Sequence, residues 1–185
     1  MVSFVLGRSL SPTAARMLEQ DADRELLLER LARVKREPVR LLNVDCGDGL
    51  LLRRALRWFP GTAMTGTDPR VSSLDRASAT VRHARFLHAD SRALPICDQT
   101  FDMAALLVGA PADRDTWWSQ LRELRRVLAD GGVLGLAGPV VSVPPDWLHQ
   151  LGMTVLDMRM RPGNDYREPL ALLVLGAYRP AIRSL

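Results

Sequence analysis

Hydrophobic and polar positions change their spacing repeatedly along the 185-residue chain. Short apolar runs typical of buried strands alternate with segments in which apolar residues recur every three or four positions, as on one face of a helix. The first helical pattern follows Ser11-Pro12, a pair typical of a helix start, and continues up to Pro38. The strands expected after it are 39–44, 63–67, 85–89, 101–108, 133–137, 153–160 and 170–178, and the expected helices are 50–59, 72–82, 116–128 and 146–151.

This alternation predicts an α/β fold, a Rossmann-like doubly wound sheet that is mainly parallel. Neighbouring parallel strands need a crossover connection, and the expected helices supply it. Only the loop 161–169 separates the last two strands, which are therefore predicted to pair antiparallel as a C-terminal hairpin. The residues 130–132, Asp-Gly-Gly, are predicted to form a turn before the fifth strand.

The strongest local signal is LLNVDCGDG at 41–49, between a strand and a helix. Gly47 and Gly49 permit a tight turn and close approach of a ligand to the backbone. The helix that follows presents free N–H groups and the positive end of its dipole at this turn. A plain strand-to-helix connection would carry the same signature, so the turn alone does not decide the matter.

Acidic residues end the next two strands. Asp68 stands 19 residues after Gly49 and could accept hydrogen bonds from the hydroxyls of a ribose, although an aspartate before Pro69 is also a common turn former. Asp90, followed by Ser91, could accept a hydrogen bond from an adenine amino group. Because open α/β sheets bind ligands at the carboxyl ends of their strands, the three signals together favour a nucleotide-like ligand.

In this order and at this spacing the segments resemble the class I S-adenosylmethionine-dependent methyltransferase family, particularly its small type 11 branch. LLNVDCGDG resembles the first motif of that family, and TGTDP at 65–69 resembles the region of its ribose-binding acid. HADSRALPICDQTFDMAALL at 88–107 and LRELRRVLADGGVLGLAG at 121–138 resemble two later motifs. The resemblance covers about residues 38–140, and the terminal hairpin fits the seven-stranded sheet of the same family.

The resemblance implies an enzyme that binds S-adenosylmethionine and transfers its methyl group to an acceptor, expected to be a small molecule. It implies an N-terminal helical lid segment at 1–37 and a cofactor-binding domain at 38–185, within one compact unit. The cofactor-binding residues that it implies are Asn43, Asp45, Cys46, Gly47, Gly49, Asp68, Pro69, Asp90, Ser91, Leu106 and Leu107. Leu106 or Leu107 is expected at the methionyl end of the pocket.

Two positions depart from the family pattern. Asn43 stands where the family has an acid at the end of the first strand, and Asp45 stands where it has a glycine. One hypothesis is compensation: if the strand continues, Asp45 lies on the same face as Asn43 and supplies the missing negative charge. The other hypothesis is obstruction of the pocket, which would leave a degenerate domain that serves as a binding module or partner subunit.

No catalytic residue is evident. Methyl transfer can depend largely on positioning, so a general base is optional. His88 could face the site or pack on the surface, and the aromatic residues Trp117, Trp118, Trp147 and Tyr166 could border an acceptor pocket or fill the core. Bound NAD is disfavoured, because Leu52 occupies the third glycine position of the dinucleotide motif.

The composition limits the classes of binding partner that are expected. The net charge is +4, with 24 arginines and one lysine spread among acidic residues, so tight nucleic-acid binding is not expected, although an RNA or protein methyltransferase stays an alternative. No segment predicts a signal peptide or a membrane span, which points to the cytoplasm. Cys46 and Cys97 are expected to be reduced, and no metal-ligand spacing occurs. The small lid is compatible with a site open to a macromolecule or completed by a second copy or partner subunit.

Overall fold

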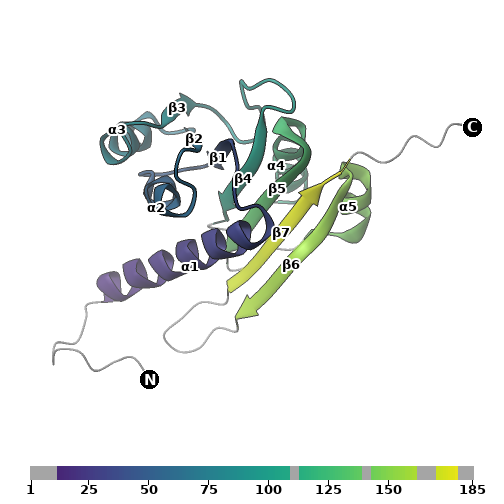
Figure 1. Ribbon diagram of the computed structural model, residues 1–185, viewed down its shortest axis with the longest axis horizontal. Helices are drawn as coiled ribbons and strands as arrows, with labels where there is room; N and C mark the ends of the chain where they lie inside the picture. Colours follow the sequence, from purple (N-terminus) through teal and green to yellow (C-terminus); the bar gives the residue numbers. More distant parts are fainter. Residues whose placement is uncertain (1–11, 109–112, 139–142, 162–169, 179–185) are drawn as a thin grey trace, which may run out of the picture.

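The computed structural model describes residues 12–108, 113–138, 143–161 and 170–178, and they form one twisted sheet with helices on both faces (Figure 1). None of the helices in these ranges has both the length and the apolar character needed to cross a membrane. The strands are β1 (Arg40–Val44), β2 (Ala63–Asp68), β3 (Arg85–His88), β4 (Phe101–Leu107), β5 (Leu128–Gly138), β6 (Met153–Arg161) and β7 (Leu170–Ala177). The helices are α1 (Pro12–Val34), α2 (Leu50–Trp58), α3 (Val71–Thr80), α4 (Arg114–Val127) and α5 (Pro145–Leu151).

The strand order across the seven-stranded sheet is β3-β2-β1-β4-β5-β7-β6. The first five strands in this order pair in parallel, whereas β7 lies antiparallel between β5 and β6. The predicted Rossmann-like sheet with an antiparallel pair of C-terminal strands is therefore confirmed. The order of the strands reverses beside β1, which has β2 on one side and β4 on the other. Such a reversal opens a crevice at the carboxyl ends of the strands.

Each face of the sheet is covered by its own apolar layer. Helices α4 and α5 cover one face, and α1 and α2 cover the other (Figure 1). Close packing of α1 depends on Gly135 in β5, because a Cβ atom there would stand only 2.8 Å from Leu27 Cδ1 and 3.0 Å from Leu31 Cδ1. The end of α1 is thus seated on the centre of the sheet.

The start of β5 differs from the prediction. Residues 130–132 lie inside β5 and not in a turn before it, since the strand begins at Leu128. Phe101 pairs with Leu128 and Met103 pairs with Val133, so that residues 129–132 form a bulge opposite Asp102. Gly131 adopts a positive φ of 75° within this bulge. The sequence Asp-Gly-Gly predicted a turn because glycine is typical of turns and of strand bulges alike.

Asp102, which belongs to the Phe-Asp pair at the start of β4, secures the entry into β1. Its carboxylate oxygens accept hydrogen bonds from the backbone N–H groups of Val39, at 2.8 Å, and Arg40, at 3.0 Å. The first residues of the central strand are thereby tied to its neighbour. This gives a motif aspartate a structural role at the edge of the sheet opposite to the carboxyl ends.

We predict that Asp102→Ala lowers the free energy of unfolding by about 1–3 kcal/mol, because two backbone donors lose a charged acceptor. Urea denaturation of the purified protein measures this change. The matched control is Glu37→Ala at a nearby exposed position, for which a change within about 0.5 kcal/mol is expected. Equal stability of both variants would contradict the role given to Asp102.

Candidate active site

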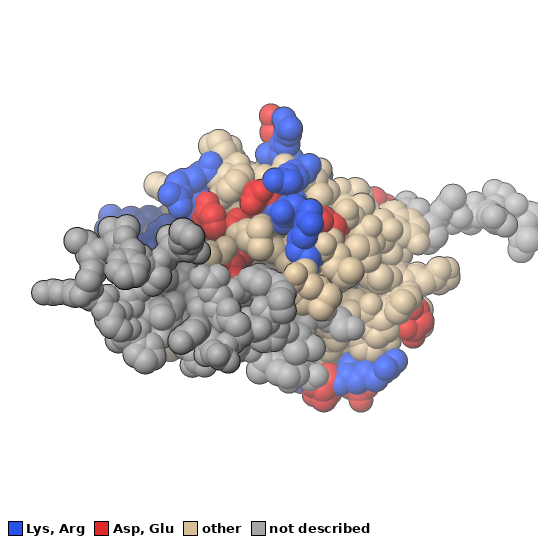
Figure 2. Space-filling view, turned by 90° about the horizontal axis from the view of Figure 1, so that it is seen from below, with Lys and Arg blue, Asp and Glu red and all other residues tan. Residues whose placement is uncertain are grey.

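Three of the predicted site residues, Asp45, Asp68 and Asp90, meet at the carboxyl edge of the sheet. Each follows or ends one of the adjacent parallel strands β1, β2 and β3. Burial contributes most to the raised pKa of Asp45, and the negative charges of Asp68 and Asp90 raise it further, which places the three carboxyl groups in one electrostatic neighbourhood. Figure 2 views the molecule from below, the side toward which β4 and β5 run in Figure 1, and acidic side chains lie there among basic ones.

Asp68 is fully buried and already holds three donors. Its Oδ2 accepts a hydrogen bond from the Gly47 N–H at 2.9 Å, and its Oδ1 accepts from the Arg70 backbone N–H at 2.9 Å and Nε at 3.2 Å. Burial alone would raise the pKa of Asp68, but these hydrogen bonds outweigh it and hold the pKa below its usual value. The carboxylate therefore stays ionised, and the exposed Arg70 side chain covers it.

Asp90 repeats this arrangement one strand further along. Its carboxylate accepts from the Arg92 backbone N–H at 2.8 Å and pairs with the guanidinium, with a shortest N–O distance of 2.6 Å. The bonds from Arg92 lower the pKa of Asp90 to about 2. Both predicted cofactor acids thus belong to an Asp-x-Arg unit in which the arginine folds back on the acid.

Asp45 differs from both, because the structure gives it no arginine of its own. β1 ends at Val44, and Asp45 has a positive φ of 51°, so the expectation that it shares a strand face with Asn43 is wrong. Its Oδ1 is buried without a hydrogen-bond partner. Burial, followed by the charge of Asp68, raises the pKa of Asp45, while a hydrogen bond from the Ser91 hydroxyl opposes this rise.

Asn43 is almost completely buried and points its amide into the sheet. Its Nδ2 donates to the carbonyl oxygens of Val44 and Ala105, both at 3.2 Å. The side chain therefore holds β1 against β4 through Ala105. The amide donors of Asn43 are engaged within the protein, whereas the oxygen without a hydrogen-bond partner at this end of the sheet belongs to Asp45.

The turn that follows has the backbone geometry expected of a glycine-rich loop. Gly47 and Gly49 have positive φ values of 57° and 76°, and Gly49 directly precedes α2. A Cβ atom on Gly49 would stand 3.2 Å from Ala77 Cβ, which explains the close approach of α3. Cys46, between the two aspartates of the motif, is buried, and burial raises its pKa to about 12, so its thiol is not a nucleophile at neutral pH.

The remaining predicted residues differ in how exposed their side chains are. Leu106 is buried in the apolar layer under α4, whereas Leu107 is only partly buried and packs on the opposite layer. Leu107 is therefore the better candidate of the two for contact with a ligand. Pro69 is exposed, and its carbonyl oxygen lies 2.8 Å from His88 Nε2, which ties the ends of β2 and β3 together. This contact gives His88 a structural role.

Two of the aromatic residues expected near an acceptor pocket pack against each other. The ring centroids of Trp118 in α4 and Trp147 in α5 lie 4.9 Å apart, and the guanidinium of Arg114 lies over the Trp147 ring, also at 4.9 Å. Trp117 and Trp118 are partly buried against the apolar layer. Tyr166 lies outside the described residues, as do much of the loops expected to form the lid and residues 1–11.

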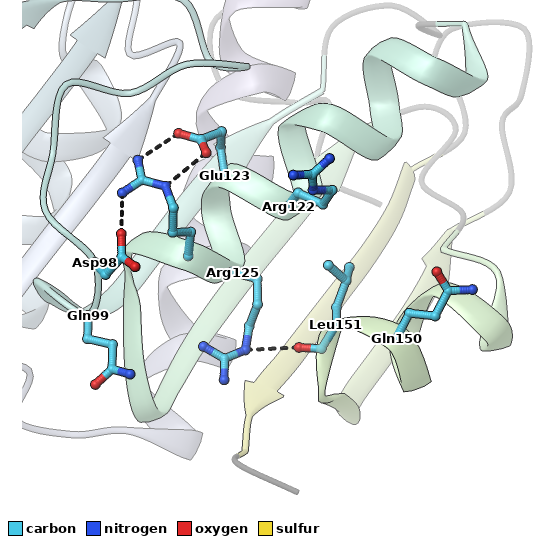
Figure 3. Close-up of a pocket in the computed structure, with 8 residues that line it drawn as sticks. Asp98, Gln99, Arg122, Glu123, Arg125, Gln150 and Leu151 are labelled. Carbon is cyan, nitrogen blue, oxygen red and sulfur yellow. Dashed lines mark hydrogen bonds and ion pairs between the residues drawn. The ribbon is translucent and has the colours of Figure 1, made fainter.

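A groove of about 400 Å³ lies between the loop before β4, α4 and α5 (Figure 3). Two of its three arginines bond within the fold: Arg125 donates to the Leu151 carbonyl at 2.9 Å, and Arg126 pairs with Asp98 and Glu123, both at 2.7 Å. None of the predicted site residues lines this groove. Within the described residues, no group of three His, Cys, Asp or Glu side chains could hold a metal ion.

Sequence reasoning missed three residues that shape this site: Arg70, Arg92 and Gln120. The repeated Asp-x-Arg pattern could have indicated both arginines, since an aspartate often bonds the backbone two residues on. Gln120 lies on α4, and its Nε2 donates to Ser91 Oγ at 2.8 Å. Only the packing of α4 against the loop after β3 reveals this contact.

Comparisons with known proteins show that this chain is similar to methyltransferases. A family model described as a methyltransferase domain matches residues 41–132. The chain is 34% identical over 116 residues to a demethylmenaquinone methyltransferase of Thermus thermophilus, covering 60% of this chain and 50% of that enzyme. It is 28% identical over 181 residues to a malonyl-[acyl-carrier protein] O-methyltransferase of Pseudescherichia vulneris, covering 96% of this chain and 68% of the relative.

A solved structure shows the same fold with its ligands. The 1,6-didemethyltoxoflavin-N1-methyltransferase of Burkholderia thailandensis, with bound 1,6-didemethyltoxoflavin and S-adenosylhomocysteine, superposes with a TM-score of 0.68 at 15% identity. The match covers 95% of this chain and 94% of that one. The chain thus spans most of this structural neighbour, but half the length of the Thermus relative.

The electrostatics of Asp45 predict a pH-dependent stability. A folded-state pKa above the usual 3.8 means that the protein has stability at low pH that is lost as the pH rises through this pKa. Asp45→Asn keeps the shape, tolerates a positive φ and cannot ionise. The free energy of unfolding of this variant should therefore exceed that of the wild type at pH 7.5, and the difference should be smaller near pH 4.

Urea denaturation at a series of pH values measures this difference. The matched control is Asp75→Asn on the exposed side of α3, which removes the same charge from a residue that is not among the causes of the pKa shifts of Asp45, Asp68 and Asp90. A difference between wild type and Asp45→Asn that does not change with pH would contradict the account of Asp45.

Proposed function

Because the chain belongs to the class I S-adenosylmethionine-dependent methyltransferase family, we propose that it is a methyltransferase that binds S-adenosylmethionine at the carboxyl edge of β1, β2 and β3. When bound, this cofactor supplies an electrophilic methyl group on a sulfonium. The acceptor loses a proton and gains the methyl group, and S-adenosylhomocysteine is released.

The observation that carries the proposal is the buried, unpartnered Oδ1 of Asp45. A buried carboxylate oxygen without a partner is costly, and this one stands beside two further aspartates. S-adenosylmethionine brings two positive charges, on its sulfonium and its ammonium. We assign the ammonium to Asp45, which then takes the role of the acid that the family has at the position of Asn43. These carboxylate acceptors therefore fit a cofactor that carries positive charge.

The other residues of the edge would orient the rest of the cofactor. Asp68 uses three acceptor positions on Gly47 and Arg70, so a ribose hydroxyl takes a remaining position or displaces the Arg70 side chain. Asp90, exposed apart from its pair with Arg92, is the acceptor that we assign to the adenine amino group. The glycine turn lets the backbone approach the amino-acid end closely.

We propose a small molecule as the acceptor, which the Thermus relative supports through the demethylmenaquinone in its name, whereas the name of the Pseudescherichia relative gives a malonyl group carried on an acyl-carrier protein. Residues 1–37 would contribute the lid of a cofactor domain that comprises residues 38–185, with the part around Leu27 and Leu31 packed on β5 as its base. The chain's own residues would then act by binding and orientation, and removal of the acceptor proton is left to the acceptor's acidity or to water.

Titration calorimetry with S-adenosylmethionine tests the proposal on the wild type, Asp45→Gly, Asn43→Asp and the double variant. We expect the wild type to bind and Asp45→Gly to bind about tenfold or more weakly, because the ammonium loses its charged partner. The two substitutions should couple, since both change the charge at one end of the pocket.

Stronger binding by Asp45→Gly would show obstruction instead and would favour the degenerate binding module. No binding by any of the four proteins would overturn the assignment of the cofactor site. Asp75→Asn again serves as the control for loss of one negative charge, and it should bind as the wild type does.

A further inference from the structure

Strand β6 forms the end of the sheet farthest from β3, and among the described residues no strand pairs with its outer edge (Figure 1). Such an edge offers a row of backbone N–H and C=O groups to another strand. The edge strand at the opposite end, β3, has four residues, whereas β6 has nine, none of them proline or lysine. A bulge between Val155 and Asp157 interrupts only the first half of β6. The second half therefore has few of the features by which natural sheets discourage pairing of their edges.

The side chains of β6 divide between the two faces of the sheet according to their partners in β7. Residues directly opposite each other in an antiparallel pair point to the same face. Val155 and Met158 stand opposite residues of the layer under α4 and α5, and the alternation of the strand places Met160 with them. Asp157 and Arg159 stand opposite residues of the other layer. The 3.6 Å ion pair between Asp157 and helix α1 agrees with this division.

The apolar side chains on the first of these faces are open to solvent. The exposed fractions are 45% for Val155, 61% for Met158 and 76% for Met160. Helix α5 packs against β6 but leaves these side chains uncovered. Single exposed apolar residues are ordinary, but several that follow one face of an unpaired edge strand are typical of an interaction surface.

The charges on the other face favour a second copy of this chain as the partner. Two identical strands that pair antiparallel are related by a two-fold axis, so opposite residues lie equally far from the axis. If the axis passes through Met158, Asp157 stands opposite Arg159 of the copy, and Arg159 stands opposite Asp157 of the copy. A shift of the axis by one residue either way sets two aspartates or two arginines opposite each other, which is destabilising. Charge complementarity therefore selects Met158 over its neighbours.

The same register brings apolar side chains together on the face that carries Met158. Met158 then meets its own counterpart, and Met160 comes opposite the bulge, where Val155 of the copy shares its face. Within one chain, Arg159 Nε and Asp157 Oδ1 lie 3.8 Å apart in a largely exposed pair, which is a weak interaction. Both faces of the edge are thus self-complementary, as an interface between two identical copies requires.

We propose that two copies of this chain associate through the outer edges of β6, antiparallel and with the two-fold axis at Met158. The two seven-stranded sheets then continue into one another. Because β4, β5 and β7 lie between β1 and β6 in each sheet, the candidate cofactor site stays away from the interface. The proposal does not depend on the cofactor, and its test needs no ligand.

Sedimentation equilibrium of the full chain over a series of concentrations measures the association. We expect the wild type to form dimers. Asp157→Arg and Arg159→Asp each set like charges opposite each other twice, so each should raise the dissociation constant of the dimer about tenfold or more. An equimolar mixture of these two variants should associate again, because the arginines of one chain then face the aspartates of the other.

Met158→Lys tests the axis itself, since it places two positive charges side by side where two apolar side chains would meet. This variant should be monomeric at concentrations at which the wild type is dimeric. The matched control is Val39→Lys, which changes a side chain of 67% exposure just before β1 and should dimerise as the wild type does. Thermal unfolding shows whether the proteins compared are folded.

A wild-type protein that stays monomeric up to about 100 µM would overturn the proposal, since association weaker than that is not a specific dimer. A dimer that persists in Met158→Lys and in both charge variants would use another surface and would overturn it too. Failure of the two folded charge variants to associate when mixed would overturn the antiparallel register. If Asp157→Arg does not fold, because it loses its partner on α1, Met158→Lys and Arg159→Asp decide the matter.

Discussion

The repulsion among Asp45, Asp68 and Asp90 is the constraint on which the rest of the site depends. Three adjacent parallel strands end at one edge, so their terminal acids must share a small region. Arg70 and Arg92 each neutralise one of them from two residues further along the chain. Asp45 has no arginine two residues further along, and Arg70 lowers its pKa by less than burial, Asp68 and Asp90 raise it, so its pKa stays raised. A cationic ligand is the simplest way to offset the remaining negative charge.

The same constraint explains why the site is costly to the fold. Asp45 has a left-handed backbone conformation that glycine adopts without strain, and its carboxyl group is pressed toward protonation by burial and by Asp68. Asp102, by contrast, bonds two backbone donors and stabilises the sheet at its other edge. Aspartates within one sheet therefore either stabilise the fold or store unfavourable energy, depending on the donors around them. Stored energy of this kind is typical of binding sites.

The sequence predicted the order and type of nearly all elements, because apolar periodicity and glycine-rich turns depend on local positions. It could not predict the bulge in β5, in which residues 129–132 lie unpaired opposite the single residue Asp102. It also misplaced Asp45 relative to Asn43, since one residue in a left-handed conformation ends the alternation of a strand. The contact of Gln120 with Ser91 could not be predicted from the sequence, because the two residues lie 29 positions apart along the chain. The candidate acids themselves were predictable from their place at strand ends.

The contacts of Asp45 favour a role in ligand binding over a role in the stability of the fold alone. A fold that needed only to relieve repulsion would let this carboxyl take up a proton, and burial acts in that direction. The hydrogen bond from Ser91 acts in the opposite direction, because it stabilises the ionised form. Ser91 is in turn held by Gln120 from another element. The buried Oδ1 atom of Asp45 has no hydrogen-bond partner, which is costly in the free protein, and an ammonium that bound there would remove this cost.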